Sequence, residues 1–170
     1  MKNHFLILFI LISFLPSITK AQAYGTAIGV RLADGFGVSL QQQIAVHTTA
    51  EIILQSALTG KKDVTLTVLG EQHNSLLTRG FNFYLGGGVY TRWMEKDENL
   101  IKQPKNPWGI APIMGLELTL GNLNLSADFK PNIKLSGDGD AFEWRTGISV
   151  RYVMAGRFFK NDNWKFWKKW

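Results

Sequence analysis

Residues 144–154 read WRTGISVRYVM, and this stretch decides the fold. Its residues alternate, and the mainly apolar set is Trp144, Thr146, Ile148, Val150, Tyr152 and Met154. Between them fall small residues and the charged Arg145 and Arg151. A period of two predicts a strand with one apolar face and one polar face. The stretch is long for a strand of a water-soluble protein, but its length suits a strand that crosses a bilayer at a tilt.

Seven further segments show the same alternation, at residues 24–32, 36–44, 50–56, 64–72, 81–93, 109–120 and 123–130. Short turn sequences separate several of them, such as Asp34-Gly35 and Gly121-Asn122. The sequence therefore predicts an all-β fold, an eight-stranded antiparallel up-and-down transmembrane β-barrel. Because proline cannot donate a hydrogen bond, Pro112 predicts a bulge within segment 109–120.

The polarity of the two faces separates a membrane barrel from a soluble one. In this register no outward position of the eight segments is charged. The inward positions hold Arg31, Glu51, Glu71, Arg92, Glu117, Asp128, Lys130, Arg145 and Arg151, and Glu143 has the same parity. A soluble barrel shows the opposite arrangement, with apolar residues inside and charges outside. A polar interior with an apolar exterior is typical of a barrel in a membrane.

The inward charges have two interpretations. A barrel of eight strands is just wide enough for its own side chains to fill it, so that the charges would pair and close the lumen. We expect this structural network. The alternative is a narrow pore in which the same charges select ions.

The two ends of the chain differ from the barrel segment. Residues 1–21 combine Lys2, an apolar run and small residues before position 22, which predicts a secretory signal peptide and a barrel domain over residues 22–154. Residues 155–170 form a basic aromatic tail, which we expect to lie against a membrane surface; the alternative is a frayed terminus whose apolar residues lean on the rim of the barrel.

The net charge lies mainly in these ends. The chain has 19 Lys and Arg and 13 Asp and Glu, and residues 22–154 hold 12 of each kind. The predicted barrel therefore lacks the basic character of a nucleic-acid-binding domain. The chain has no cysteine, which excludes disulfides and thiolate chemistry.

With these segments, the YLGGGVYTRW stretch at residues 84–93 and the closing WRTGISVRYVM, the chain resembles the small outer-membrane β-barrel proteins of the OmpA/OmpX-like type. The TKAQ region at 19–22 and the glycine-rich stretch are similar to porin-family barrels common in Bacteroidetes. The resemblance implies a bacterial outer-membrane location and contact with outer-membrane lipids, lipopolysaccharide and the barrel-assembly machinery. It also implies a role without catalysis, in envelope structure or surface interaction. Such barrels usually end at an aromatic residue, whereas this chain continues beyond Met154.

Candidate reactive residues are few. Some outer-membrane barrels are lipid A hydrolases with a His-x-Ser pair, and His73 and Ser75 fit that spacing with Glu71 nearby. By parity His73 faces inward, so a plain polar turn is favoured over a catalytic site. Glycines 86–88 lack the lysine and the helix of a phosphate-binding loop, and the Asp-Gly-Asp sequence at 138–140 is read as a solvated turn. The sequence predicts no catalytic residue, cofactor or metal.

Aromatic residues at the segment ends predict the two membrane interfaces. With both chain ends periplasmic, loops 33–35, 57–63, 94–107 and 131–142 would face outward. The aromatics expected at the outer interface are Trp93, Trp108, Phe129 and Trp144. Those expected at the inner interface are Tyr24, Phe81 and Tyr152.

Overall fold

The structure, a computed structural model, describes residues 25–57, 63–76, 80–95 and 103–154. The strands in these ranges are β1 (Thr26–Leu32), β2 (Gly35–Ala45), β3 (Thr48–Ala57), β4 (Val64–Ser75), β5 (Phe81–Trp93), β6 (Trp108–Leu120), β7 (Leu123–Phe129), β8 (Asn132–Ser136), β9 (Phe142–Glu143) and β10 (Thr146–Met154). Among the described residues, no helix is long and apolar enough to cross a membrane. The predicted signal peptide and tail, and Tyr24, lie outside the described residues.

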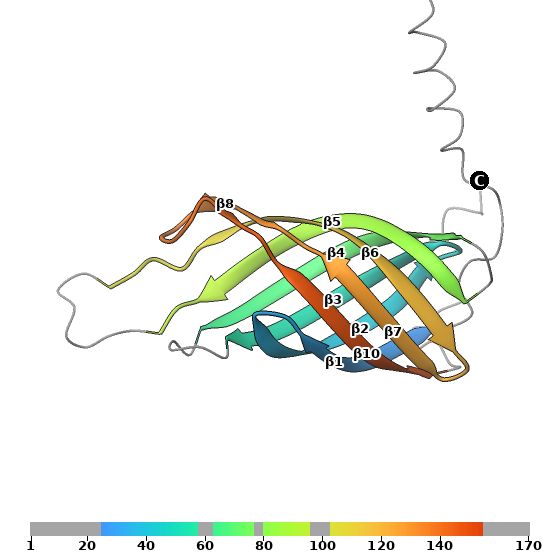
Figure 1. Ribbon diagram of the computed structural model, residues 1–170. Helices are drawn as coiled ribbons and strands as arrows, with labels where there is room; N and C mark the ends of the chain where they lie inside the picture. The colour runs from blue at the N-terminus through green and yellow to red at the C-terminus, as the bar shows by residue number, and fades with distance from the viewer. Residues whose placement is uncertain (1–24, 58–62, 77–79, 96–102, 155–170) are drawn as a thin grey trace, which may run out of the picture.

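Eight of these strands close into a barrel (Figure 1). The order around it is β5-β4-β3-β2-β1-β10-β7-β6, and pairing of β5 with β6 completes the ring. Each neighbouring pair is antiparallel. The predicted all-β, eight-stranded antiparallel barrel is therefore confirmed.

The strands are staggered around the barrel. Glu117 on β6 lies opposite Asn82 on β5. Followed the other way round, the ladder of paired residues from Glu117 runs through Ser126, Ser149, Arg31, Gly37, Gln55, Thr65 and Arg92. It thus returns to β5 ten residues further along, at position 92 instead of 82. Such a stagger tilts the strands and brings residues that are distant in sequence to the same level of the lumen.

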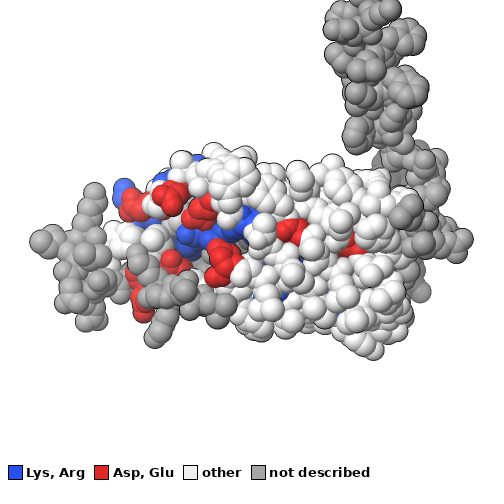
Figure 2. All heavy atoms as spheres, in the orientation of Figure 1, with Lys and Arg blue, Asp and Glu red and all other residues white. Residues whose placement is uncertain are grey.

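The two faces of each strand differ in the way that the alternation predicts. In β10, Ile148, Val150 and Tyr152 point outward and are exposed, whereas Ser149 and Arg151 point inward and are buried. Figure 2 shows the result over the visible face of the molecule. The wall is almost entirely uncharged, and charged atoms gather at the end that carries β8. We call this the hairpin end; the opposite end, where Thr26 pairs with Met154, is the terminal end.

Most strand bounds shift by one or two residues from the prediction, and three regions differ in a way that matters for the lumen and the hairpin end. β10 begins at Thr146, so Trp144 and Arg145 precede it. β4 continues to Ser75, where a polar turn was expected. The predicted loop 131–142 contains β8, which pairs with the first residues of β6 at the hairpin end, and it leads into β9. These pieces lack a clear alternation, because they are short or extend beyond the apolar wall.

The bulge predicted at Pro112 is wrong. Pro112 lies opposite Gly87, and the β5–β6 register runs without a shift on both sides of this pair. On its other side, β6 is paired with β8 only as far as Ile110 and with β7 only from Met114 onward. The pairs Met114–Phe129 and Ile110–Ile133 share one register, which places Pro112 opposite Pro131. Neither proline can donate to the ladder, so the pairing is interrupted there without a bulge.

Candidate functional site

The polar interior of the barrel is the candidate site. Of the predicted inward charges, seven side chains are buried: Arg31, Glu51, Glu71, Glu117, Asp128, Lys130 and Arg151. The other two, Arg92 and Arg145, are half-buried at the hairpin end. All nine come from strands or their immediate ends, so the backbone alternation directs them inward.

Arg31 on β1 and Asp128 on β7 form a two-pronged ion pair inside the lumen, over β10. Both terminal nitrogens of Arg31 donate to the carboxylate of Asp128, each at 2.6 Å, and both side chains are fully shielded from solvent. Tyr84 also donates its hydroxyl to Asp128, at 3.3 Å. Room for the guanidinium depends on Gly147, because a Cβ at this position would collide with it. A paired geometry of this kind satisfies a buried charge better than a single contact.

Arg151 makes a second buried network nearer the terminal end. Its Nη2 contacts the carboxylate of Glu51. Its Nε donates to Ser39 at 2.8 Å, and its Nη1 donates to Ser126 at 2.8 Å and to Asn124 at 3.3 Å. One guanidinium therefore links side chains from β2, β3, β7 and β10 across the lumen.

A third group surrounds His73, which is fully buried. Its Nε2 lies 2.9 Å from Thr49 Oγ1 and 3.5 Å from a carboxylate oxygen of Glu71, and its Nδ1 lies 3.7 Å from a carboxylate oxygen of Glu117. The imidazole also stacks on Tyr84, with 5.2 Å between ring centroids. The ring therefore sits between two carboxylates and fills this part of the lumen.

A fourth group, which we call the mouth cluster, consists of Asp34, Arg92, Glu143 and Arg145 at the hairpin end. Glu143 contacts Arg92 and accepts from Arg145 Nη2 at 2.9 Å, and Arg145 Nη1 lies 3.1 Å from Asp34. A small polar cavity of about 50 Å³ adjoins Asp34, Arg92 and Arg145. The cluster ties β9 and the β1–β2 turn to the end of β5.

The mouth cluster predicts a pH dependence. Partial burial acts to raise the pKa of Glu143, but the hydrogen bond from Arg92 and the charge of Arg145 outweigh it, so its pKa is lowered below 4.5. An acid with a lowered pKa in the folded state stabilises that state above its unfolded pKa, and this contribution is lost as the pH falls through the folded pKa. We expect Glu143→Gln to remove part of the acid-induced loss of stability, measured by urea unfolding in lipid vesicles at pH 7 and at pH 3.

The control for this experiment is Asp140→Asn, because Asp140 is exposed near the same hairpin. It should keep the pH dependence of the unchanged chain. An unchanged pH dependence in Glu143→Gln would show that the mouth cluster does not contribute.

Lys130 differs from the other buried cations. Its side chain is buried and its Nζ donates to Thr67 at 3.1 Å. Within the described residues no carboxylate lies within ion-pair distance of it, although Asp128 and Glu51 act on it over a longer range. The buried charge of Lys130 is therefore balanced by carboxylates at longer range, and not by a direct ion pair.

Comparison with known proteins bears on the fold. No protein-family model and no curated protein matches the sequence. Among solved structures, the N-terminal β-barrel domain of Pseudomonas aeruginosa OprF matches with a TM-score of 0.55 at 11% identity, over 76% of this chain and 95% of that one. The chain has the fold of a small outer-membrane β-barrel. Neisserial surface protein A also matches, with a TM-score of 0.47 at 12% identity, over 76% of this chain and 93% of that one.

In this outer-membrane barrel fold, both residues of the His-x-Ser pair belong to a strand of the wall and point toward the lumen. His73 and Ser75 both lie in β4, so the predicted plain turn is wrong. The two residues share the lumen face, and Ser75 donates to Asn82 at 3.1 Å. His73 is enclosed by lumen side chains and does not face the surrounding lipid, so the geometry gives no support to a lipid hydrolase.

The described aromatic residues expected at the interfaces lie near the strand ends. Trp93, Trp108, Phe129 and Trp144 lie toward the hairpin end, and Phe81 and Tyr152 lie toward the terminal end. Trp144 also packs against Phe129 and Phe142, with ring centroids 5.2 Å and 4.8 Å apart. The sequence did not single out Phe142, since it lies in a segment predicted to be a loop.

Sequence reasoning also missed the neutral partners of the charges. Gln41 donates to Glu71 at 2.8 Å, and Asn82 donates to Glu117 at 3.1 Å. Their inward parity was available, but amides and hydroxyls are common on any polar face. The sequence therefore predicted only the charged members of the lumen network.

Proposed function

We propose that the chain is an integral protein of the bacterial outer membrane, without catalytic activity, whose lumen is closed by its own side chains. Its role is structural or lies in surface interaction. Outer-membrane lipids and lipopolysaccharide surround the wall, and the barrel-assembly machinery inserts the chain.

The outward face supports the membrane location. Large apolar side chains on it are exposed around the barrel, including Val30, Leu40, Leu54, Val89, Ile110 and Val150. A continuous apolar belt of this kind would be unfavourable in water, whereas lipid covers it without cost. A closed barrel also satisfies its backbone hydrogen bonds internally, as the hydrocarbon region requires.

The buried side-chain pairs in the lumen are the observation that supports the proposed role. The buried pair of Arg31 with Asp128 joins β1 to β7 over β10, and the buried pair of Arg151 with Glu51 joins β10 to β3 across the interior. His73 and Tyr84 fill the space beside them. A lumen occupied in this way supports a plug, in preference to the ion-selective pore.

Conductance tests this proposal. The full chain, folded in lipid and shown to be a barrel by a heat-dependent shift on a gel, should give no ion current in planar bilayers. Steady single-channel currents from folded protein would contradict the closed lumen and support the pore. Folded protein that partitions into the soluble fraction would contradict the membrane location.

The topology gives a further prediction. If the hairpin end faces the cell exterior, trypsin added to intact cells should cut after Lys105, which is exposed at this end. Lys96 and Lys102, two other expected cleavage sites, lie outside the described residues. The β2–β3 turn at His47 contains no trypsin site, so a cleavage sequence inserted there serves as the control and should be cut only in permeabilised cells. If trypsin cut the sequence inserted at His47 in intact cells and left Lys105 uncut, the orientation would be the opposite of the predicted one.

A further inference from the structure

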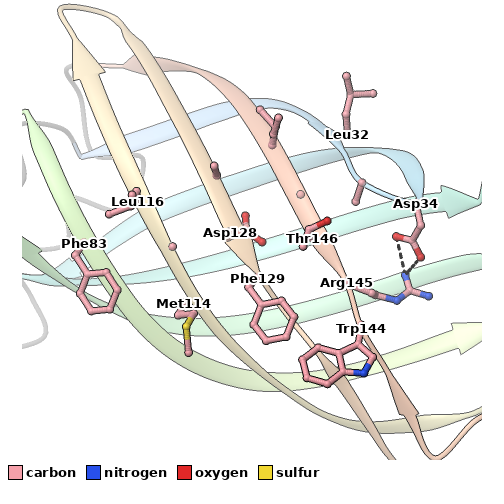
Figure 3. A pocket seen from close by; sticks show the side chains of 15 residues that line it. Leu32, Asp34, Phe83, Met114, Leu116, Asp128, Phe129, Trp144, Arg145 and Thr146 are labelled. Atoms are coloured by element: carbon pink, nitrogen blue, oxygen red, sulfur yellow. Dashed lines mark hydrogen bonds and ion pairs between the residues drawn. The ribbon is translucent and has the colours of Figure 1, made fainter.

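A furrow interrupts the outer face of the barrel over β6, β7 and β10 (Figure 3). It has a volume of about 1040 Å³ and is open to the outside. A second, smaller hollow of about 240 Å³ lies beside it. The two share Leu116, Ala127 and Ile148, so that together they form one depression along the wall.

The furrow exists because one outward side chain is short. Ala127 on β7 lies between Leu116 on β6 and Ile148 on β10 in the same ladder of paired residues. Its neighbours on the floor, Gly115 and Gly147, contribute only backbone, because the position where each lacks a side chain faces the lumen. The floor is thus formed by a methyl group and backbone, while larger side chains stand around it.

Those larger side chains are apolar. Figure 3 shows Phe83, Met114, Phe129 and Trp144 in a row along one side of the furrow. Leu32 lies on the other side in this view, and Ile148 also lines the furrow. At the hairpin end the lining includes Asp34 and Arg145, which pair with one another. The furrow is therefore apolar along its length and ends at a polar pair whose two charges cancel.

We infer that this furrow binds one acyl chain of a membrane lipid. This inference rests on the proposed membrane location. The furrow is continuous with the lipid-facing belt, so the molecules that reach it are those of the bilayer. Because lipid tails are as apolar as the wall, burial of apolar area adds little, and binding depends on van der Waals contacts with the floor and both sides. A flexible chain of methylene groups can make these contacts.

Other occupants fit less well. The wall of a second barrel is convex and would bridge the two sides of the furrow without reaching Ala127. The basic tail at residues 155–170 would bring its lysines into the hydrocarbon region, which is costly. The four charges of the mouth cluster sum to zero, so the shape of the chain, and not the charge of a headgroup, selects the ligand.

Native mass spectrometry of the full chain, transferred from dimyristoyl phosphatidylcholine vesicles into detergent, tests the inference. The unchanged protein should retain one lipid molecule. Ala127→Phe, which fills the furrow from its floor, should weaken lipid retention by about tenfold, because the displaced chain loses its contacts. Ala50→Phe is the matched control, since Ala50 points outward on β3, on a different part of the wall, and should retain the lipid.

The outcomes separate this inference from the proposed function. Heat-dependent gel mobility shows whether each variant forms the barrel, and a soluble wild type would contradict the proposed function itself. If the wild type is a folded membrane barrel that retains no lipid, or if Ala127→Phe and the smaller Ala127→Leu retain lipid as the wild type does, the inference is wrong. If the wild type is a dimer and Ala127→Phe disrupts that dimer, the furrow binds a second copy of the chain, and the lipid inference is also wrong.

Discussion

Replacing Val150 with arginine is expected to lower the free energy of unfolding by about 2–4 kcal/mol, as arginine does on the lipid face near the midplane of a membrane barrel. Val150 lies in the middle of β10, is 41% exposed and points away from the lumen. The same change on the surface of a water-soluble protein would have little effect. Urea unfolding in lipid vesicles, followed by tryptophan fluorescence, measures the difference.

The matched control is Val46→Arg. Val46 is also an exposed valine, at 61%, but it lies in the turn between β2 and β3 at the terminal end. The cost of arginine falls to about 0–1 kcal/mol near the interfaces. Equal losses at Val150 and Val46 would show that the outer face of β10 is not within hydrocarbon.

Breaking the pair of Arg31 and Asp128 should have the other large effect. Asp128→Asn leaves the shape of the side chain almost unchanged but removes the charge that Arg31 faces, and both groups are fully buried. Removing one partner of a buried ion pair costs about 3–5 kcal/mol, because the remaining charge is left uncompensated. Arg31→Met should cost a similar amount for the same reason.

The double variant Arg31→Met with Asp128→Asn should be more stable than either single variant. It buries no unpaired charge, and the amide oxygen introduced by Asp128→Asn can still accept the hydrogen bond of Tyr84. The exposed pair at the mouth is the control: Asp34 is half-exposed, and Asp34→Asn should change stability by about 0–1 kcal/mol. Additive effects of the two lumen changes in a double-mutant cycle would contradict a coupled pair.

The sequence predicted the barrel because the outward residues repeat strictly. In β10, for example, one shift in register would place Arg151 in the lipid and Val150 in the lumen, so the alternation fixes the face of each residue. It could not predict β8, because residues 132–136 lie at the hairpin end, where neither face must be apolar. It misjudged Pro112 because the register that places Pro131 opposite it cannot be read from the alternation within one segment.

The candidate site was less predictable than the fold. Parity placed Arg31 and Asp128 on the inward face, but they are 97 positions apart in the sequence. Whether they meet depends on the registers of β1 and β7 against β10, which no local pattern reports. The furrow at Ala127 was hidden for a similar reason, since alanine is unremarkable in β7 until its neighbours on β6 and β10 are known.

The central claim is that the apolar face of each strand contacts lipid while the polar face lines a closed lumen. Because the chain has no cysteine, single cysteines can be placed along β10 and spin-labelled without interference. In vesicles, labels at Ile148, Val150 and Tyr152 should collide readily with dissolved oxygen and rarely with a water-soluble nickel complex, and labels at Ser149 should collide rarely with either. High nickel collision rates at Ile148 and Val150, or the absence of a two-residue period, would contradict the account.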